Sequence, residues 1–436
     1  MTRLVALDVG SSSVRAVAYD EHGRAEPGDA RLLTAELDAE GLVEACRAVL
    51  SEVGEGDLLA VSCFWHSLIA VDRHDRPLTP VLSWRDLAGG EPPKLDPVGY
   101  HRRTGCFLHP AYWPAKVLRL AQQGVEAARF LSFGDFLLLR LTGELRTSIS
   151  TASGTGLYDP NRCTWDEETL DALGIDPSQL APVSDDPIGN VYPALGDGAC
   201  SNVGVGATGR DRAAVMIGTS GAARVVYAAN RAEPRAGLFL YRLDERRFCE
   251  GGALSDGGNL HAWLLATLRD VDGGALDTSH LDEQPPGAHG LVFLPFLGGE
   301  RSLGWDPSRR GMIDGLSFAT TTRDIAQAAL EAVCYRFADV LEALEPVESI
   351  VATGGALLAS PAWVQILADV LGRPVEVSAV EEGSARGAAL IALERLGSPA
   401  PPAPIDHVVE PRLDRHEIHL HAIAEQRARM QTEETS

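Results

Sequence analysis

Hydrophobic positions near the start of the chain follow the pattern of β-strands. Residues 4–20 form two runs rich in Val, Leu and Ala around a Gly-Ser turn, and this pattern predicts a β-hairpin. Residues 215–228 repeat the order, with an apolar strand, a turn of Gly and small hydroxyl residues, and a Val-rich strand. Because the two hairpins open halves of similar length, we expect a duplicated α/β chain with domains over 1–210 and 211–436.

Other segments show the spacing or the capping signals of helices. They are 41–53, 113–123, 134–142, 325–344, 361–371 and 384–396. The fifth starts after the cap Ser360, ends at Gly372 and leads into a strand at 375–378. The small residues Ala385–Ala389 at the start of the last helix predict a close approach by another element or by a ligand.

The end of the chain, after residue 398, is first rich in Pro and then polar. We expect a mobile tail without a function. His416, His419 and His421 lie in this tail, where a solvated face is a better interpretation than a metal cluster.

The string from Gly204 to Gly209 has the GxGxxG spacing of a dinucleotide-binding turn. Such a turn needs a strand before it and a helix after it. Here Arg210-Asp211-Arg212 and then a strand follow, so we reject that function and expect an interdomain turn. The sequence has no GxxxxGK[ST] string, so a nucleotide would be bound without a P-loop.

Composition restricts the classes of partner. The 436 residues carry a formal net charge of −23 without any basic run, so nucleic acid is not expected as a partner. The longest apolar runs are too short to span a bilayer, which argues against a transmembrane protein and a membrane partner. Seven scattered cysteines without a CxxC pair indicate reduced core thiols, and the N-terminus does not resemble a signal peptide, so we expect a cytoplasmic protein.

The turns of the two hairpins carry backbone N–H groups and hydroxyls that suit a phosphate chain. One turn is Gly10-Ser11-Ser12-Ser13, and the other is Gly218-Thr219-Ser220. Either one alone would be an ordinary turn, but their recurrence favours phosphate binding. Asp8, just before the first turn, is a poor strand former, which indicates a role near Mg²⁺. At Gly354-Gly355-Ala356, between a strand and a capped helix, the backbone can approach a nucleotide.

Six segments carry motifs that point to one family. They are LDVGSSSVRA, STASGTGLYDPNRCTW, IGTSGAARV, LPFLGGERSLGWDPSRRGMIDGLS, TGGALLASPAWVQILADVLGRPVEV and EEGSARGAALIAL. In these motifs the chain resembles the FGGY carbohydrate kinases over nearly its whole length. The resemblance implies an α/β fold of two ribonuclease-H-like, actin-like ATPase domains that close over a cleft. It also implies ATP and Mg²⁺, with phosphates at the two hairpin turns and adenosine at Gly354, Gly355 and Ala356.

The resemblance implies the residues of the active site as well. The catalytic base of the family is an Asp between glycines, which corresponds here to Asp197 in Leu195-Gly196-Asp197-Gly198. From the residues alone, Asp197 would be interpreted as a turn residue. The substrate-binding residues should combine aromatic rings with acceptors for hydroxyl groups, and we expect them in the first domain. They are His66, Trp84, Asp86, His109, Tyr112 and Lys116.

The stretches WHSLIAVDRHDRPLTPVLSWRD and RTGCFLHPAYWPAKVLRL look most like gluconate kinases. We therefore expect phosphorylation of a small sugar or sugar acid, gluconate first, with Lys116 or Arg85 near its carboxylate. Because Trp84-Arg85-Asp86-Leu87 departs from the pattern of that subgroup, a ketose or polyol kinase, such as one for xylulose, is the alternative. A non-catalytic actin-like nucleotide-binding protein is the second alternative, although it would not need Asp197. A homodimer is one possible assembly.

Overall fold

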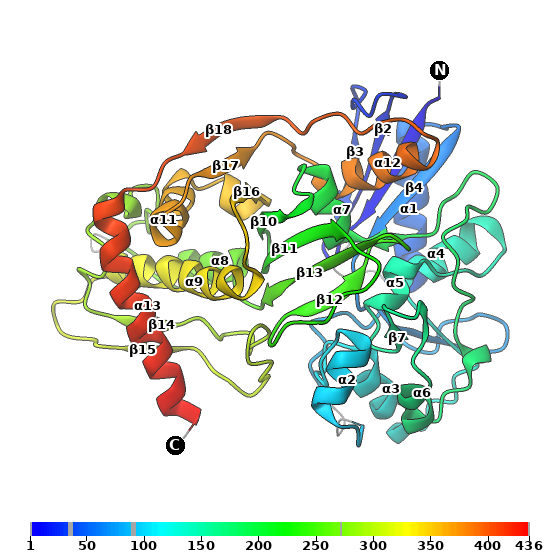
Figure 1. The fold of residues 1–436 in the computed structure, drawn as a ribbon, viewed down its shortest axis with the longest axis horizontal. Coiled ribbons are helices and arrows are strands. Elements are labelled where there is room, and N and C mark those ends of the chain that lie inside the picture. The colour runs from blue at the N-terminus through cyan, green and yellow to red at the C-terminus, as the bar shows by residue number, and fades with distance from the viewer. Residues whose placement is uncertain (1, 34–37, 89–92, 271–272, 435–436) are drawn as a thin grey trace.

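Two mixed β-sheets form the frame of the molecule, with helices packed on both (Figure 1). The computed structural model describes residues 2–33, 38–88, 93–270 and 273–434. The N-terminus and the C-terminal helix lie at opposite ends of the molecule (Figure 1). In the described part of the chain, none of the helices is both long and apolar enough to cross a lipid bilayer.

The first sheet has the strand order β3-β2-β1-β4-β9. Its strands are β1 Leu4–Val9, β2 Ser13–Tyr19, β3 Ala30–Leu33, β4 Leu58–Cys63 and β9 Leu195–Gly196. β1 and β2 are antiparallel, as are β2 and β3, whereas β1 with β4 and β4 with β9 are parallel. The hairpin predicted over residues 4–20 is therefore confirmed.

The second sheet has the order β12-β13-β11-β10-β16-β17-β18. Its strands are β10 Gly209–Ile217, β11 Gly221–Ala228, β12 Phe239–Arg242, β13 Arg247–Leu254, β16 Ser349–Thr353, β17 Val375–Ser378 and β18 Ile405–Val409. From β13 to β17 the pairings are antiparallel, antiparallel, parallel and parallel, which repeats the first sheet from β3 to β9. This repeat confirms the predicted duplication, while the division near residue 210 stays a prediction.

Helices cover the two sheets, and three small strand pairs lie beside them. The pairs are β5 Ile69–Val71 with β6 Arg129–Leu131, β7 Tyr158–Asp159 with β8 Thr164–Trp165, and β14 Val292–Leu294 with β15 Met312–Asp314. The helices are α1 Ala39–Val53, α2 Pro97–Thr104, α3 Trp113–Gln122, α4 Phe133–Thr142, α5 Ile149–Ser153, α6 Glu167–Leu173, α7 Asp197–Gly204, α8 Gly258–Thr267, α9 Thr322–Leu344, α10 Gly355–Leu358, α11 Pro361–Leu371, α12 Gly383–Arg395 and α13 Leu413–Glu434. All six predicted helices are present. The Ser360 hydroxyl caps α11 by accepting from Trp363 N, and Gly372 ends that helix at a φ of 62°.

Helix α12 connects the two halves of the chain, because it follows the second sheet in sequence but packs on α7, β1 and β4. Figure 1 shows it beside the first sheet. A Cβ atom at Gly204 would lie 1.8 Å from Gly383 O, and one at Gly387 would lie 1.8 Å from Cys200 O. The close approach predicted from the small residues of α12 is therefore to another helix, α7. The GxGxxG string forms the turn between α7 and β10, as expected.

The prediction of a mobile tail after residue 398 is wrong. β18 pairs antiparallel with β17, and α13 packs along α11 and β14. The buried side of α13 includes His419, Ile423 and Gln426 at helical spacing, so most of that side is polar. An amphipathic helix is recognised by an apolar stripe, and such a stripe is missing from the described part of this side of α13.

The histidines of the tail are not a uniformly solvated face either. His419 is buried, and its Nδ1 is hydrogen-bonded to the Tyr335 hydroxyl at 3.0 Å. His416 is half-buried and donates from Nδ1 to the carbonyl of Asp369. Only His421 of the three is exposed. The first two therefore attach α13 to α9 and α11.

Candidate active site

The first hairpin brings Asp8 to the end of β1, directly before the turn 10–12. Asp8 lies opposite Arg15 in β2 and opposite Ser62 in β4. The Ser62 hydroxyl donates to Asp8 Oδ1 at 2.9 Å, and Arg15 Nη1 lies 3.9 Å from Oδ2. Burial raises the pKa of Asp8 to about 7 against the hydrogen bond from Ser62, and the negative charge of Asp197 raises it further. Asp8 is thus a buried acid that a nearby cation would keep ionised.

The second hairpin turn, residues 218–220, lies against two other loops of the second half. Amides at the start of α8 donate to it, from Gly258 N to Gly218 O at 2.9 Å and from Asn259 N to Thr219 O at 2.8 Å. Gly354 follows β16 with a φ of 95°, and a Cβ atom there would lie 2.5 Å from Ile217 O. The structure therefore brings the predicted phosphate turn and the predicted nucleotide turn together.

Asp197 is the first residue of α7 and is partly accessible. The Gly198 N–H donates to its Oδ1 at 2.8 Å. Burial raises the pKa of Asp197, while the charge of Arg224 and the amides of Gly198 and Trp65 oppose the rise. A Cβ atom at Gly196 would lie 1.8 Å from Trp65, and one at Gly198 would lie 2.8 Å from Arg224. The flanking glycines thus let an indole and a guanidinium pack beside the carboxylate.

The start of α12 links the first hairpin to Asp197. Arg15 forms an ion pair of 2.7 Å with Glu382, the cap residue of α12. The Ser384 hydroxyl donates to the backbone carbonyl of Asp197 at 3.4 Å. Asp8 and Asp197 therefore lie in one region, held by the helix that joins the halves.

His66, Asp86 and Lys116 form one side of the predicted substrate site. Lys116 is 1% exposed and donates from Nζ to the carbonyls of His66 and Ala111, each at 2.8 Å. Burial lowers the pKa of Lys116 to about 7, while the negative charge of Asp86 acts to raise it. Asp86 accepts a hydrogen bond from the Ser83 amide. His66 has a φ of 66° and donates from Nδ1 to Gly154 O, so its neutral ring presents an acceptor at Nε2. Lys116 thus fixes the backbone of His66.

Aromatic rings from both halves of the chain meet around His66. The ring centroids of His66 and Tyr112 are 4.9 Å apart, and those of Tyr112 and Trp305 are 5.7 Å apart. The hydroxyls of Tyr112 and Tyr241 are hydrogen-bonded at 2.5 Å. His109 lies edge-on to Trp305 at 5.4 Å. The second half therefore contributes Tyr241 and Trp305 to a site expected in the first half alone.

Arg301 is the main residue of this region that sequence reasoning missed. Its Cζ lies 5.2 Å from the ring centroid of Trp84 and 5.8 Å from that of Trp305. Arg85, the predicted cation, is exposed and lies against the same Trp84 ring, with Nη2 3.5 Å from Ser11 Oγ. The sequence signal for Arg301 was a charged Glu-Arg pair that follows the apolar run 291–297 after two glycines.

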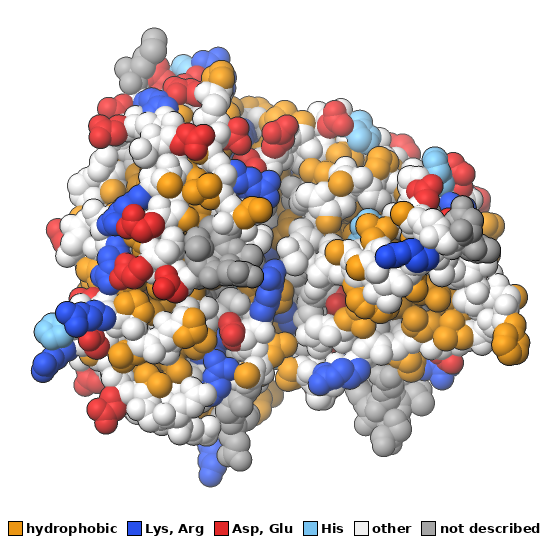
Figure 2. All heavy atoms as spheres, turned by 180° about the vertical axis from the view of Figure 1, so that it is seen from behind, with side chains coloured by type: hydrophobic (Ala, Val, Ile, Leu, Met, Phe, Trp, Pro, Cys, Tyr) orange, Lys and Arg blue, Asp and Glu red, His pale blue; other side chains and the backbone are white. Residues whose placement is uncertain are grey.

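The face seen in Figure 2 shows two lobes, and Lys and Arg side chains lie along the line where they meet. The site thus contains two carboxylates, two glycine-containing hairpin turns and an aromatic cluster with buried basic side chains. A carboxylate near clustered backbone amides suits transfer of a phosphoryl group to a hydroxyl.

Comparisons with known proteins agree with this chemistry. Residues 3–218 match the N-terminal domain of the FGGY family of carbohydrate kinases, and residues 213–394 match its C-terminal domain. A gluconokinase of Bacillus subtilis (strain 168) is 28% identical over 90% of this chain and 88% of its own length.

Solved structures share the whole fold. A gluconate kinase from Lactobacillus acidophilus is 25% identical, has a TM-score of 0.86 and covers 99% of this chain and 98% of its own. A xylulose kinase from the same organism is 24% identical, has a TM-score of 0.87 and covers the same shares, which shows the fold alone. The actin-like fold class predicted from the sequence is confirmed. The chain belongs to the FGGY family of carbohydrate kinases and is an ATP-dependent sugar kinase.

Proposed function

We propose that this kinase transfers the γ-phosphoryl group of ATP to the terminal hydroxyl of gluconate. The observation that carries the choice is the buried positive charge of Arg301, which lies among neutral histidines on the substrate side. In a protein of charge −23, such a site favours an acid over an uncharged sugar. The similarity to gluconokinases in sequence and in structure supports the same substrate.

Asp197 acts as the general base in this proposal. Its raised pKa makes the carboxylate a stronger acceptor for the hydroxyl proton, while the charge of Arg224 keeps it ionised. Loss of the proton lets the sugar oxygen attack the γ-phosphorus. The amides of the two hairpin turns hold the phosphate oxygens in place, so that most of the catalysis is positioning and charge stabilisation.

Mg²⁺ fits the first hairpin. Asp8 is a buried carboxylate whose Oδ2 has only a distant cation, Arg15 at 3.9 Å. No group of three or more potential ligands is present among the described residues. This suits Mg²⁺, which commonly binds through one or two carboxylates and completes its shell with phosphate oxygens and water. When bound, the ion would neutralise charge on the phosphates.

A substrate panel tests this function. ADP formation is measured with gluconate, with glucitol as its uncharged polyol counterpart, and with xylulose, and ³¹P NMR of the product identifies the phosphorylated hydroxyl. We expect the highest kcat/KM for gluconate. A higher value for xylulose would favour the second candidate, a ketose kinase.

A further inference from the structure

Arg301 is a buried cation without a counter-ion. The side chain is 8% exposed, and its Nε is buried without a hydrogen-bond partner. Among the described residues, its guanidinium makes no hydrogen bond or ion pair. Burial lowers its pKa, but a guanidinium remains charged in proteins. An unpaired buried charge is costly. Its presence here indicates that a bound ligand supplies the counter-ion of Arg301.

His109 presents a second unused donor beside the same indole. The Ala111 N–H donates to His109 Nδ1 at 3.1 Å, so the neutral ring carries its proton on Nε2. That Nε2 is buried and has no partner among the residues that the structure describes. The charge of Arg301 contributes to the low pKa of His109, which shows that the two groups are near each other. Both also lie within 6 Å of the Trp305 ring.

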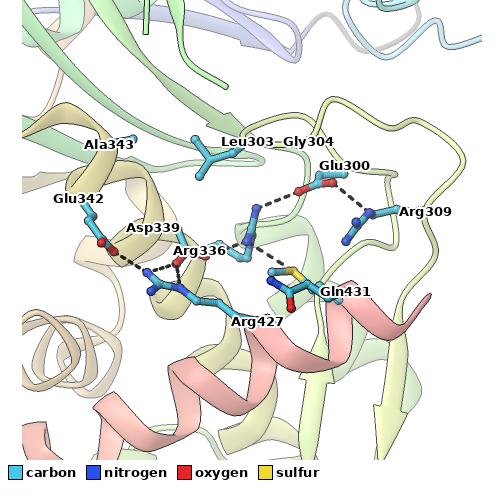
Figure 3. A pocket seen from close by; sticks show the side chains of 11 residues that line it. Glu300, Leu303, Gly304, Arg309, Arg336, Asp339, Glu342, Ala343, Arg427 and Gln431 are labelled. Carbon is cyan, nitrogen blue, oxygen red and sulfur yellow. Dashed lines mark hydrogen bonds and ion pairs between the residues drawn. The ribbon is translucent and has the colours of Figure 1, made fainter. Parts of the chain in front are cut away.

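The residues on each side of Arg301 are fixed, Glu300 by buried ion pairs and Ser302 by hydrogen bonds. Glu300 accepts from Arg336 at 2.8 Å and from Arg309 at 3.1 Å. Figure 3 shows these contacts at the wall of an open pocket of about 650 Å³, with Arg336 reaching Glu300 from α9. Ser302 N donates to Ala253 O at 2.9 Å. Arg301 is thus the unpaired residue in a loop whose neighbours are fixed, as expected for a preorganised binding group.

We propose that Arg301 and His109 Nε2–H form the subsite that binds the carboxylate of the sugar acid. This assignment rests on the proposed function. It replaces Lys116, two of whose donors are already used by backbone carbonyls, and Arg85, which is exposed. The charge of Arg301 also lowers the pKa of Asp197. The proposed carboxylate subsite and the proposed general base therefore lie at one site. A carboxylate accepts two hydrogen bonds at once from a guanidinium, which gives orientation as well as affinity.

Arg301→Met tests the proposal by binding, turnover and stability together. We expect the gluconate Kd from calorimetry and the gluconate KM to rise roughly 10- to 100-fold, while the KM of a neutral acceptor changes less than about threefold. The free variant should melt at the same temperature as the wild type or higher, because an unpaired buried charge is gone. The increase in melting temperature that gluconate causes should be lost.

Two further variants serve as comparisons. Arg210→Met removes an exposed arginine that stacks on Tyr227 with Cζ 3.7 Å from the ring, outside this site. It should leave the gluconate Kd unchanged. Arg85→Met removes the rival cation, which also lies against the Trp84 ring. This variant should keep the preference for gluconate over glucitol.

The outcomes separate the two proposals. Unchanged gluconate binding in Arg301→Met, or a variant that does not fold, would overturn the carboxylate subsite and leave the gluconate kinase proposal standing. If the wild type binds gluconate without phosphorylating it, and Arg301→Met loses that binding, the subsite stands and the proposed function falls. If the wild type neither binds nor phosphorylates gluconate, both are wrong.

Discussion

The two hairpins have the same backbone pattern but different side chains. In the first, Asp8 precedes the turn by two residues, whereas Met216 holds that position in the second. Each second strand contributes an arginine toward a carboxylate. Arg15 lies 3.9 Å from Asp8 of its own hairpin, but Arg224 lies beside Asp197, which belongs to the first half.

This difference shows how a duplicated fold can become asymmetric. Both copies keep a glycine-containing turn with an internal hydrogen bond, from Gly10 N to Ser13 O in the first and from Gly218 N to Ser220 O in the second. Asp8 and Asp197 both belong to the first half, and in the proposed mechanism the second hairpin binds phosphate through its backbone and supplies the cation Arg224. Substitutions at Asp197, Asp8, Gly354 and Arg224 would test this division.

Asp197→Asn should lower kcat roughly 10²- to 10⁴-fold, because an amide keeps the shape but cannot accept the proton. Steady-state ADP formation measures the loss. Asp185→Asn is the matched control, since Asp185 also has a pKa raised by burial and also accepts from the first amide of a helix, Ile149 N. Its kcat should stay within about threefold of the wild type. Normal turnover in Asp197→Asn would remove the residue from this role.

Asp8→Asn should weaken the apparent affinity for Mg²⁺ about 10- to 100-fold, while the Kd of metal-free ADP is unchanged. Titration of activity with Mg²⁺ and calorimetry with ADP give the two values. Asp20→Asn, at the far end of the same hairpin, is the control, because its carboxylate only stabilises the turn to Arg24. An equal loss of ADP affinity would instead indicate that Asp8 has a structural role.

Gly354→Ala should destabilise the protein by roughly 1–3 kcal/mol, because its φ is positive and the new Cβ would meet Ile217 O. Chemical denaturation measures the change, and the ATP KM should rise with it. Gly10→Ala, in the turn of the first hairpin, is the comparison. A Cβ there meets only Ser13 O at 3.1 Å, so the loss should be smaller. Equal losses would mean that the two turns are not distinguished by their packing.

Arg224→Met should move the acid limb of kcat/KM to higher pH. A general base works only when it is ionised, so activity falls as the pH drops through its pKa. The charge of Arg224 lowers the pKa of Asp197, and without that charge the fall begins at a higher pH. A pH profile from 5 to 9 measures the shift, with Arg210→Met as the control. If the acid limb of kcat/KM does not move in Arg224→Met, a group other than Asp197 determines it.

Local patterns predicted the elements of this fold well. Apolar runs on either side of Gly-containing turns located both hairpins, and capping signals such as Ser360 located α11. The terminal helix α13 was missed because His419 and Gln426 on its buried side satisfy their polar groups through tertiary partners that no local pattern reveals.

The candidate site was predictable only in part. The hairpin turns were singled out from their residues and their recurrence, whereas Asp197 was assigned only by resemblance. Arg301, Tyr241 and Trp305 became part of the substrate region only when distant segments came together. An expectation that confined sugar binding to the first domain could not include them.

The hydrogen bond between Tyr112 and Tyr241 has a consequence for the inheritance of specificity. Gene shuffling that exchanged the second half for that of a related kinase would bring in new residues at the positions of Tyr241, Arg301 and Trp305. The acceptor preference of the chimera would change even though every residue of the first half was retained. In the proposed substrate site, specificity is therefore a trait of the pair of halves, and recombination at their junction would alter it in one step.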